Sequence, residues 1–445
     1  MEFFIKASQL FTSLSILIVL HELGHFIPAR LFKTRVEKFY LFFDPWFSVI
    51  KKKIGNTEYG IGWLPFGGYV KISGMIDESM DKEQMSLPPK PWEFRSKPAW
   101  QRLIIMSGGV IVNLLLGVFI YSMTLFYYGD KYLPNKGLTD GVWCVSELGE
   151  SLGFKTGDKI ITADGVEIIR FSDVLEKVMV SKKITVSRGG QLVELTMPVD
   201  LIDQFLNSNE KMIFYPRVPT IIGSFTEGSE LQSSGFLIKD QIVGINGTPI
   251  KYYDSFKKEI ENHKGSPVLI EIVRDGSRLN LTAAVNEDGF LGFKAAIPSI
   301  NQLEELGVCQ TAYVNYSFFD SFPAGYNKAI KKLNSYIDQF ALILSPSTGA
   351  YKGLGGFGAI GSMFPAKWNW EVFWNVTAFI SIILAFMNIL PIPALDGGHI
   401  LFLLYEMVVG RPAPEKVIEY AQIIGVVLLL SLVAYANLND IFRLL

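Results

Sequence analysis

The chain has 445 residues, of which 49% are hydrophobic, and its mean hydropathy is positive at +0.28. This length allows two to four domains, and this composition predicts a protein that lies partly in lipid. The net charge of −2 and the lack of a basic stripe argue against a nucleic-acid-binding protein, so no nucleic acid is expected among the partners.

The first predicted element is a membrane-spanning helix over residues 1–30. Its apolar run carries no charge between Lys6 and Arg30 except Glu22, as expected of a transmembrane segment. His21 and His25 stand four apart, so one face of a helix would carry both imidazoles beside Glu22. This HExxH pattern predicts a zinc hydrolase. A cleavable signal peptide is the alternative, although no small-residue cleavage site follows.

Residues 31–102 are predicted to form a cytoplasmic loop, because positive charge gathers at the start of this segment. Seven basic residues lie there: Arg30, Lys33, Arg35, Lys38, Lys51, Lys52 and Lys53. Alternating and aromatic residues within 36–74 predict β-strands that touch the membrane. An ordinary cytoplasmic hairpin is the alternative.

A second span is predicted over residues 103–129, which carry no charge. Residues 130–370 have few basic residues beside that span and are therefore predicted to be external. Their two cysteines, Cys144 and Cys309, lie where a disulfide is chemically permitted, and a free pair fits the sequence equally well.

The external segment contains an internal repeat. Residues 153–165 recur as residues 235–247, 82 positions later, and each copy reads as a turn, an aspartate, a short strand and an Asp-Gly or Asn-Gly turn. The copies resemble PDZ domains. We therefore expect two PDZ-like, β-rich domains at residues 130–220 and 221–300.

PDZ domains bind extended peptides by adding a strand to a sheet edge. Spacers that only shape access to the membrane site are an equally weighted alternative, because nothing in the sequence identifies an occupied groove. The second copy departs from the pattern, since it has Lys239 where the first has Gly157.

Residues 301–370 are predicted to hold an amphipathic helix and a glycine-rich linker. Apolar residues recur at helical steps over 326–344, which is typical of a helix on the outer leaflet or against a PDZ-like module. Its position before the third span favours the leaflet. The glycines of 353–361 predict a flexible loop, because the strand and the Lys-Ser/Thr pair of a phosphate-binding loop are missing.

The third span, residues 371–400, ends in a broken segment. Pro391 and Pro393 remove two backbone donors, which lipid tolerates only beside protein or a watery cavity. We therefore expect Asp396 next to such a cavity, as the third ligand of a zinc site. A carboxylate at the membrane surface is the alternative for Asp396.

The last part of the chain is predicted to return to the membrane. Residues 401–419 would form a cytoplasmic loop, and residues 420–445 a fourth span, since no charge lies between Glu419 and Asp440. The expected fold is a polytopic α-helical membrane protein with four transmembrane helices, a membrane-associated β element and two external PDZ-like domains.

The order of these motifs resembles the site-2 protease family of intramembrane zinc metalloproteases, in its proteobacterial RseP-type branch. HExxH lies in span one, the PDZ-like modules lie between spans two and three, and NxxPxPxLDG lies in span three. The resemblance covers nearly the whole chain. It implies that His21, His25 and Asp396 hold one zinc ion per chain and that Glu22 is the general base.

The resemblance also implies a substrate-binding strand, which involves Asn388, Pro391 and Pro393 in span three and Gly67 and Gly68 in the β element. His399 has no helical partner in the motif and is expected to be structural or to support a ligand. One departure lies in span two, where Val110 stands in place of the proline that relatives usually have.

By resemblance, the protein is a multi-pass inner-membrane endopeptidase with periplasmic PDZ-like domains. Its expected partners are the lipid bilayer and single-span membrane proteins already trimmed outside, such as an anti-sigma factor of an envelope-stress pathway, and remnant signal peptides. A membrane PDZ scaffold with a vestigial metal site is the alternative from another class, and a transporter that uses the broken span is a third. The intact HExxH motif argues against both.

Overall fold

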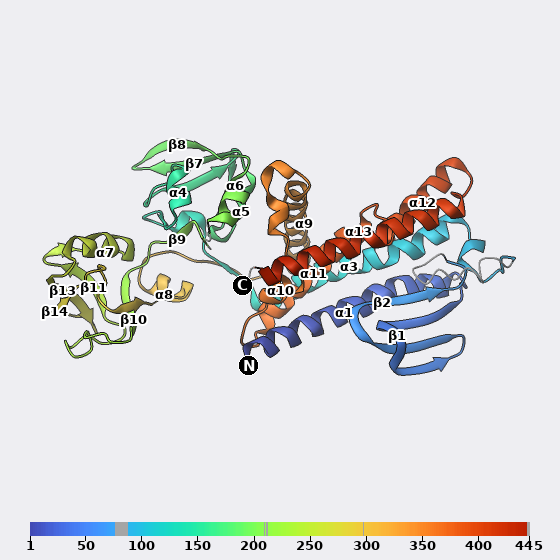
Figure 1. The fold of residues 1–445 in the computed structure, drawn as a ribbon, viewed down its shortest axis with the longest axis horizontal. Helices are drawn as coiled ribbons and strands as arrows, with labels where there is room; N and C mark the ends of the chain where they lie inside the picture. Colours follow the sequence, from blue (N-terminus) through green and yellow to red (C-terminus); the bar gives the residue numbers. More distant parts are fainter. Residues whose placement is uncertain (76–87, 209, 211, 297, 443–445) are drawn as a thin grey trace. The chain divides into compact units, whose positions relative to one another are not determined.

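The computed structural model describes residues 1–75, 88–208, 210, 212–296 and 298–442. The chain forms two compact units, which Figure 1 shows as ribbons. We call the first the membrane unit, which comprises Met1–Gly129, Asn315–Leu344 and Tyr351–Leu445. The second is the β unit, which comprises Asp130–Val314 and Ser345–Ala350.

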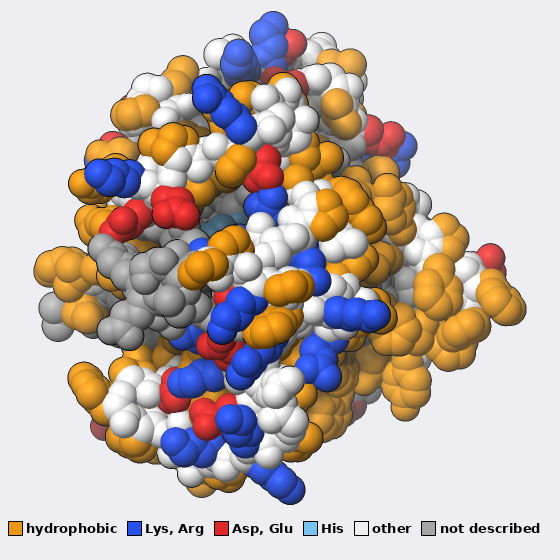
Figure 2. Space-filling model, turned by 90° about the vertical axis from the view of Figure 1, so that its right-hand side faces the viewer, with side chains coloured by type: hydrophobic (Ala, Val, Ile, Leu, Met, Phe, Trp, Pro, Cys, Tyr) orange, Lys and Arg blue, Asp and Glu red, His pale blue; other side chains and the backbone are white. Residues whose placement is uncertain are grey.

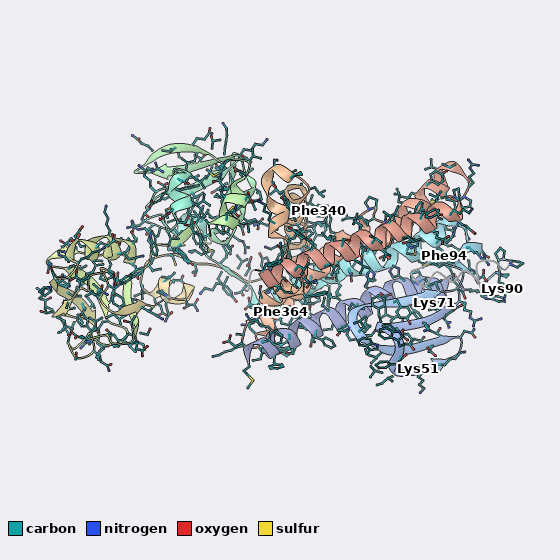
Figure 3. The ribbon with its side chains drawn as sticks, viewed as in Figure 1. Lys51, Lys71, Lys90, Phe94, Phe340 and Phe364 are labelled. Carbon is teal, nitrogen blue, oxygen red and sulfur yellow. The ribbon has the colours of Figure 1, made fainter. Side chains whose placement is uncertain are left out.

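Within the described residues, four helices of the membrane unit are long and apolar enough to cross a bilayer. They are α1 (Glu2–Leu31), α3 (Ala99–Tyr128), α11 (Trp370–Ile389) and α13 (Glu415–Phe442). Phe364 and Phe94 belong to separate apolar clusters at opposite ends of this unit (Figure 3). The protein is therefore a multi-pass membrane protein, as its uncharged stretches predicted.

The third span breaks where its prolines predicted. The helix α11 ends at Ile389, and α12 (Asp396–Val409) begins after Pro391 and Pro393, neither of which can donate a backbone hydrogen bond. The first part of the predicted cytoplasmic loop over residues 401–419 is helical, because α12 continues until the left-handed Gly410 ends it, and the side of the membrane on which the segment lies stays a prediction.

A long β-hairpin follows α1. Its strands β1 (Val36–Ile54) and β2 (Thr57–Ile72) are antiparallel, and Gly55 supplies the positive φ of 62° that the tight turn needs. The hairpin packs against α1, where Gly68 meets Ile18 so closely that a Cβ would not fit. The predicted strands are confirmed, and their contact with lipid stays a prediction.

The amphipathic helix is α9 (Phe318–Ile343), and it packs across α3 and α11. Ala329 on its inner face is buried in the cluster that these helices share, and Nζ of Lys328 donates to the side chain of Asn375 at 2.7 Å. The buried side of α9 carries Ser321, Gly325 and Ala329, whereas Tyr326 and Ile337 of its predicted apolar face are exposed.

Residues 353–361 do not form the flexible loop that their glycines predicted. They contain α10 (Phe357–Ser362). The carboxylate of Asp440 accepts hydrogen bonds from the backbone N–H groups of Gly356 and Ala359 at 2.9 and 3.0 Å. An acidic group satisfies the free donors of a helix N-terminus, so a distant residue orders this segment.

The β unit holds two sheets of similar construction. The strands of the first sheet run in the order β6-β5-β7-β8. They are β5 (Lys159–Ala163), β6 (Val166–Glu167), β7 (Lys183–Arg188) and β8 (Gln191–Thr196). The helices of the same module are α4 (Glu147–Ser151), α5 (Val174–Val180) and α6 (Leu201–Asn207). The strands of the second sheet run in the order β14-β13-β11-β10-β15, and β12 pairs with β11 beside this path. They are β10 (Thr220–Phe225), β11 (Gln241–Ile245), β12 (Thr248–Pro249), β13 (Pro267–Arg274), β14 (Ser277–Ala284) and β15 (Phe293–Ala295). The helix of this module is α7 (Tyr253–Ile260). Two short pairs join β4 (Val142–Cys144) to β9 (Phe214–Pro216) and β3 (Asp130–Tyr132) to β16 (Ala312–Val314).

An ion pair between a buried aspartate and a partly exposed arginine occupies the same place in both modules. Arg188 binds Asp158 at 2.7 Å in the first, and Arg274 binds Asp240 at 2.6 Å in the second. Each arginine also donates to the carbonyl of the glycine that opens its copy of the repeat. The predicted pair of β-rich modules is thereby confirmed.

Residues 301–314 belong to the β unit and not to the predicted linker over residues 301–370. The helix α8 (Ile300–Glu305) and β16 lie here, and apolar side chains from this stretch fill the core of the first module. Cys309 lies in that core together with Cys144, and both cysteines are buried and free. The last strand of the second sheet, β15, ends at Ala295, and the core of the first module recruits residues from beyond that strand.

Candidate metal centre

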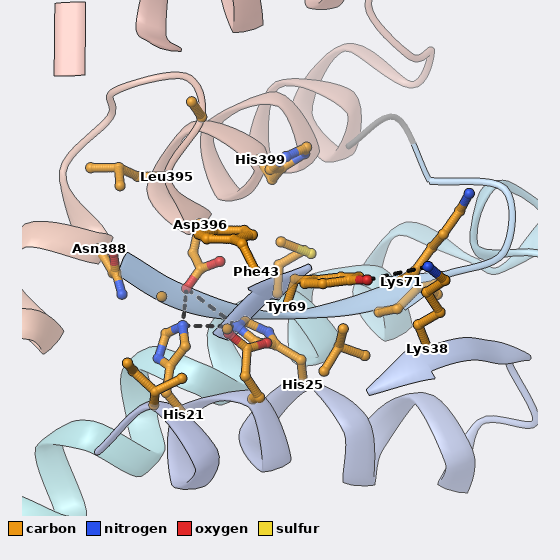
Figure 4. A pocket seen from close by; sticks show the side chains of 18 of the residues that line it. His21, His25, Lys38, Phe43, Tyr69, Lys71, Asn388, Leu395, Asp396 and His399 are labelled. Atoms are coloured by element: carbon orange, nitrogen blue, oxygen red, sulfur yellow. Dashed lines mark hydrogen bonds and ion pairs between the residues drawn. The ribbon is translucent and has the colours of Figure 1, made fainter. Parts of the chain in front are cut away.

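Three side chains from distant parts of the chain meet in the membrane unit. His21 and His25 lie one turn apart on one face of α1, and Asp396 is the first residue of α12. Nε2 of His21 lies 3.3 Å from Nε2 of His25, and Oδ2 of Asp396 lies 3.4 Å from each (Figure 4). The three predicted ligands are therefore brought together, and we call them the triad.

The triad has the dimensions of a zinc site. Zinc binds nitrogen and oxygen ligands at about 2.0–2.1 Å in tetrahedral geometry, which places any two ligands about 3.3–3.4 Å apart. The three observed distances are 3.3, 3.4 and 3.4 Å. Two imidazoles and one carboxylate would leave the fourth position for water or substrate, as in catalytic zinc sites.

The carboxylate of the triad also needs a partner. Oδ2 of Asp396 is buried and makes no hydrogen bond with the described residues, although both histidine nitrogens lie near it. A buried anionic oxygen without a donor is costly, and a metal ion shared with the histidines would satisfy it. Glu22 and His25 are only 8% and 6% exposed, so both side chains are largely kept from bulk solvent.

The helix α3 supports both imidazoles from behind. Nδ1 of His25 lies 2.8 Å from the carbonyl oxygen of Ile105, and Nδ1 of His21 lies 3.2 Å from Nδ2 of Asn113. Gly109 stands between these two α3 residues, and a Cβ there would overlap both rings. Hydrogen bonds at the outer nitrogen orient metal-binding histidines, so α3 is placed to fix the direction of each Nε2.

A cavity of about 800 Å³ opens beside the triad in the membrane unit. Glu22 lines it, as a general base must. Asn388, Gly67 and Gly68 line it too, and Figure 4 shows Asn388 beside Asp396. Three of the five predicted substrate-binding residues therefore reach the same space as the triad.

Pro391 and Pro393 are not among the residues that line this cavity. The carbonyl oxygen of Pro393 instead lies against Gly425 of α13, where a Cβ would overlap it. In the structure these prolines shape the break that carries Asp396, and they offer no surface to a molecule in the cavity.

The hairpin adds polar side chains that the sequence analysis did not single out. The hydroxyl of Tyr69 donates to Asp44 at 2.7 Å, and Nζ of Lys38 lies 3.4 Å from that hydroxyl (Figure 4). All three residues line the cavity. No sequence spacing brings them together, because repeated bulges shift the register between β1 and β2.

The two remaining histidines lie outside the triad. Nε2 of His399 lies 2.8 Å from Nε2 of Gln422, and both residues line the cavity. His263 lies in the β unit, 3.4 Å from Glu259. Gln422 was missed, and the signal that could have found it is a polar residue inside the fourth apolar stretch.

Nearly the whole chain is similar in sequence to known proteases. A sequence model described as peptidase family M50 matches residues 9–432. Protease RseP of Yersinia pestis is 28% identical over 455 residues, which cover 97% of each chain. The regulator of sigma E protease of Haemophilus influenzae is 27% identical over 473 residues, 100% of each chain, and RseP of Escherichia coli K12 is 27% identical over 452 residues, 97% of each chain.

Proposed function

Because this chain belongs to peptidase family M50 and is a zinc metalloprotease with transmembrane helices, we propose that it cleaves single-span membrane proteins within or just below the bilayer. The family membership confirms the resemblance that the motifs indicated. The observation that carries the proposal is the triad, which joins α1 to the end of the third span and opens into a cavity lined by Glu22.

We assign one zinc ion per chain to the triad. His21 and His25 would bind it through Nε2 and Asp396 through Oδ2, because these atoms have the required types and mutual distances. When bound, zinc polarises a peptide carbonyl and lowers the pKa of water to about 7.

Glu22 is proposed as the general base. It stands on α1 between the two histidines, and its side chain lines the cavity. A carboxylate oxygen of Glu22 would accept a proton from the attacking water and later donate it to the leaving amine nitrogen. Proton transfer by a positioned side chain typically contributes about 10²–10⁴-fold to a rate.

The substrate backbone is proposed to lie along β2 and Asn388. A transmembrane segment must unwind to be cut, and its freed N–H and C=O groups then need partners. Residues 58–61 of β2 are paired with β1 on both sides, whereas residues 64–72 pair with β1 on one side only in the described structure, so this second part of β2 has an edge that can accept a further strand. Gly67 and Gly68 carry no side chains that would cover this edge beside Glu22, and the Asn388 amide can both donate and accept.

Residues 31–102 are proposed to face the cytoplasm of a bacterial inner membrane, with the β unit in the periplasm. Lys and Arg side chains gather at one end of the membrane unit, the face seen in Figure 2. Lys51, Lys71 and Lys90 lie at that end in Figure 3, and Phe364 lies at the other. Positive charge beside membrane spans favours the cytoplasmic side.

The proposed substrates are single-span proteins that have already been trimmed outside. An anti-sigma factor of an envelope-stress pathway is the first candidate, since two relatives are named as regulators of sigma E protease. Remnant signal peptides are the second. Two external modules would exclude a bulky ectodomain and let a short stub pass.

The test incubates the purified full-length protein in detergent with a panel of single-span segments that carry short external stubs. We expect cleavage that stops with a zinc chelator and returns when zinc is restored. Glu22→Gln is the matched control, because it keeps the size of the side chain and removes the base. Cleavage that survives this substitution would refute the mechanism. A folded, zinc-loaded protein that cuts no segment would favour the scaffold alternative.

A further inference from the structure

The outer nitrogens of the two triad histidines have different partners. Nδ1 of His25 lies 2.8 Å from the backbone carbonyl oxygen of Ile105. A carbonyl oxygen can only accept, so the ring proton of neutral His25 sits on Nδ1 and Nε2 keeps a free lone pair. This is the tautomer that a metal at Nε2 requires.

His21 needs the same tautomer, but its partner is an amide. Its Nδ1 lies 3.2 Å from Nδ2 of Asn113. An amide nitrogen can only donate, so this orientation makes Nδ1 an acceptor and puts the ring proton on Nε2. Nε2 faces Asp396 and His25, where a proton would take the place of the metal.

The side-chain oxygen of Asn113 can hold the tautomer of His21 that a metal at Nε2 requires. Oδ1 of Asn113 is buried and has no hydrogen-bond partner among the described residues. The oxygen and nitrogen of an amide exchange places by a half-turn, and only the hydrogen-bond network tells them apart. When Asn113 is turned over, its oxygen faces Nδ1 of His21, accepts the ring N–H and frees Nε2.

We propose that Asn113 is a positioning residue for the zinc centre, whose side-chain oxygen accepts a hydrogen bond from Nδ1–H of His21 and holds Nε2 ready for the metal. The inference rests on the proposed function, because it takes the triad as the zinc site. Asn113 is fully buried, and the hydroxyl of Ser381 donates to its backbone carbonyl at 2.7 Å, so α3 is tied to α11 at this residue. The backbone of Gly109, which contacts the same ring, is the competing partner.

Three substitutions of nearly constant size separate these roles. Asn113→Asp keeps an acceptor and removes the donor, whereas Asn113→Leu removes both. Thr377→Val is the matched control, since it removes a buried hydroxyl that bonds Ser13 at 2.9 Å in the same helix bundle, outside the cavity. Full-length proteins in detergent are equilibrated with zinc and graded chelator, and retained zinc is measured by elemental analysis. The readout therefore does not depend on activity.

We expect Asn113→Leu to weaken zinc binding about 10–100-fold, as losses of such supporting partners do. Asn113→Asp should bind zinc at least as well as the natural protein, and Thr377→Val should not change the affinity. Should Asn113→Leu fail to fold, the comparison of Asn113→Asp with the natural protein decides, because an acceptor role predicts no loss of zinc from Asn113→Asp and a loss would overturn it.

Three other results would overturn the inference. Equal loss of zinc in the Asp and Leu variants would show that a hydrogen-bond acceptor at residue 113 does not hold the site, and equal retention in both would make Gly109 the acceptor. Tighter zinc binding by Asn113→Leu than by Asn113→Asp would indicate that Asn113 supports the site through packing alone. The reason is that burying a charge costs more than burying an apolar group. Natural protein that holds no zinc at all would instead refute the proposed function, so the two failures are distinguishable.

Discussion

Gly24 of α1 and Gly108 of α3 are in direct backbone contact behind the triad. A Cβ on either glycine would overlap the carbonyl oxygen of the other. Small residues let two helices approach this closely in a membrane. Because His25 follows Gly24 and Gly109 follows Gly108, this crossing sets the distance between the histidines and the α3 groups that orient them.

Gly108→Ala should push α1 and α3 apart. Overpacking of this kind costs about 1–3 kcal/mol, so we expect a lower melting temperature in detergent and weaker zinc retention. Gly361→Ala is the control, because the nearest atom to its new Cβ would be Cδ2 of Leu10 at an ordinary 3.6 Å. If Gly108→Ala keeps both stability and zinc, the crossing does not position the ligands.

Glu22→Gln and His21→Ala should fail in different ways. The first should keep zinc and the fold and lose proton transfer, at a cost of about 10²–10⁴-fold or more in rate. The second should lose zinc as well, because two ligands remain. Metal content and cleavage rate are measured on the same preparations. Equal loss of zinc in both variants would show that Glu22 is a ligand.

Replacing residues 133–311 with a short flexible linker should let untrimmed substrates be cut. Tyr132 of β3 pairs with Ala312 of β16, so the two cut ends are neighbours and a short linker can join them. Every triad residue lies outside the replaced segment, so cleavage of short substrates should persist. The measurement compares cleavage of long and short versions of one substrate by both enzymes. An unchanged preference would leave peptide binding or spacing as the role of the modules.

Lys239→Gly should stabilise the second module by about 1 kcal/mol, since a left-handed conformation costs an L-residue roughly that much. Lys239 has φ 77°, and Gly157 has φ 95° at the equivalent place in the first module. Gly157→Ala should correspondingly destabilise the first module. Hydrogen exchange of β11 and β5 in the full-length protein measures each effect locally. Faster exchange of β11 after Lys239→Gly would contradict the prediction.

Neither cysteine should react while the β unit is folded. Burial raises the pKa of the Cys144 thiol to about 11 and also raises the pKa of Cys309. At pH 8 only about one Cys144 side chain in a thousand would then be the reactive thiolate. We expect mass spectrometry to find both thiols unalkylated in native protein and modified after unfolding. A disulfide between them in freshly isolated protein would contradict the structure.

Local patterns in the sequence predicted the elements that carry the site. The four apolar stretches, the HExxH spacing, the prolines before Asp396 and the internal repeat each depend on residues close together in the chain. The meeting of Asp396 with the histidines could be expected from the break in the third span and from the resemblance, and the structure now shows the three together. The partners of the triad could not be predicted, because the register of α3 against α1 decides that Asn113 faces His21.

The errors share a physical cause. Residues 353–361 are ordered by Asp440, and residues 301–314 are held by the core of the first module. In both stretches, contacts with residues far away in sequence override local composition. Glycine content and repeat boundaries reflect only the conformational preferences of residues close together in the chain, so neither could reveal these long-range contacts.

The division of the triad between the two ends of the chain bears on how the protein matures. His21 and His25 enter the membrane with the first span, whereas Asp396 follows the third, after the β unit has been synthesised. A chain released early from the ribosome would hold two ligands and could not close a three-ligand zinc site. Molecules that end before Asp396 would therefore be inert toward neighbouring membrane proteins, and competence for proteolysis would arise only after the third span has been made.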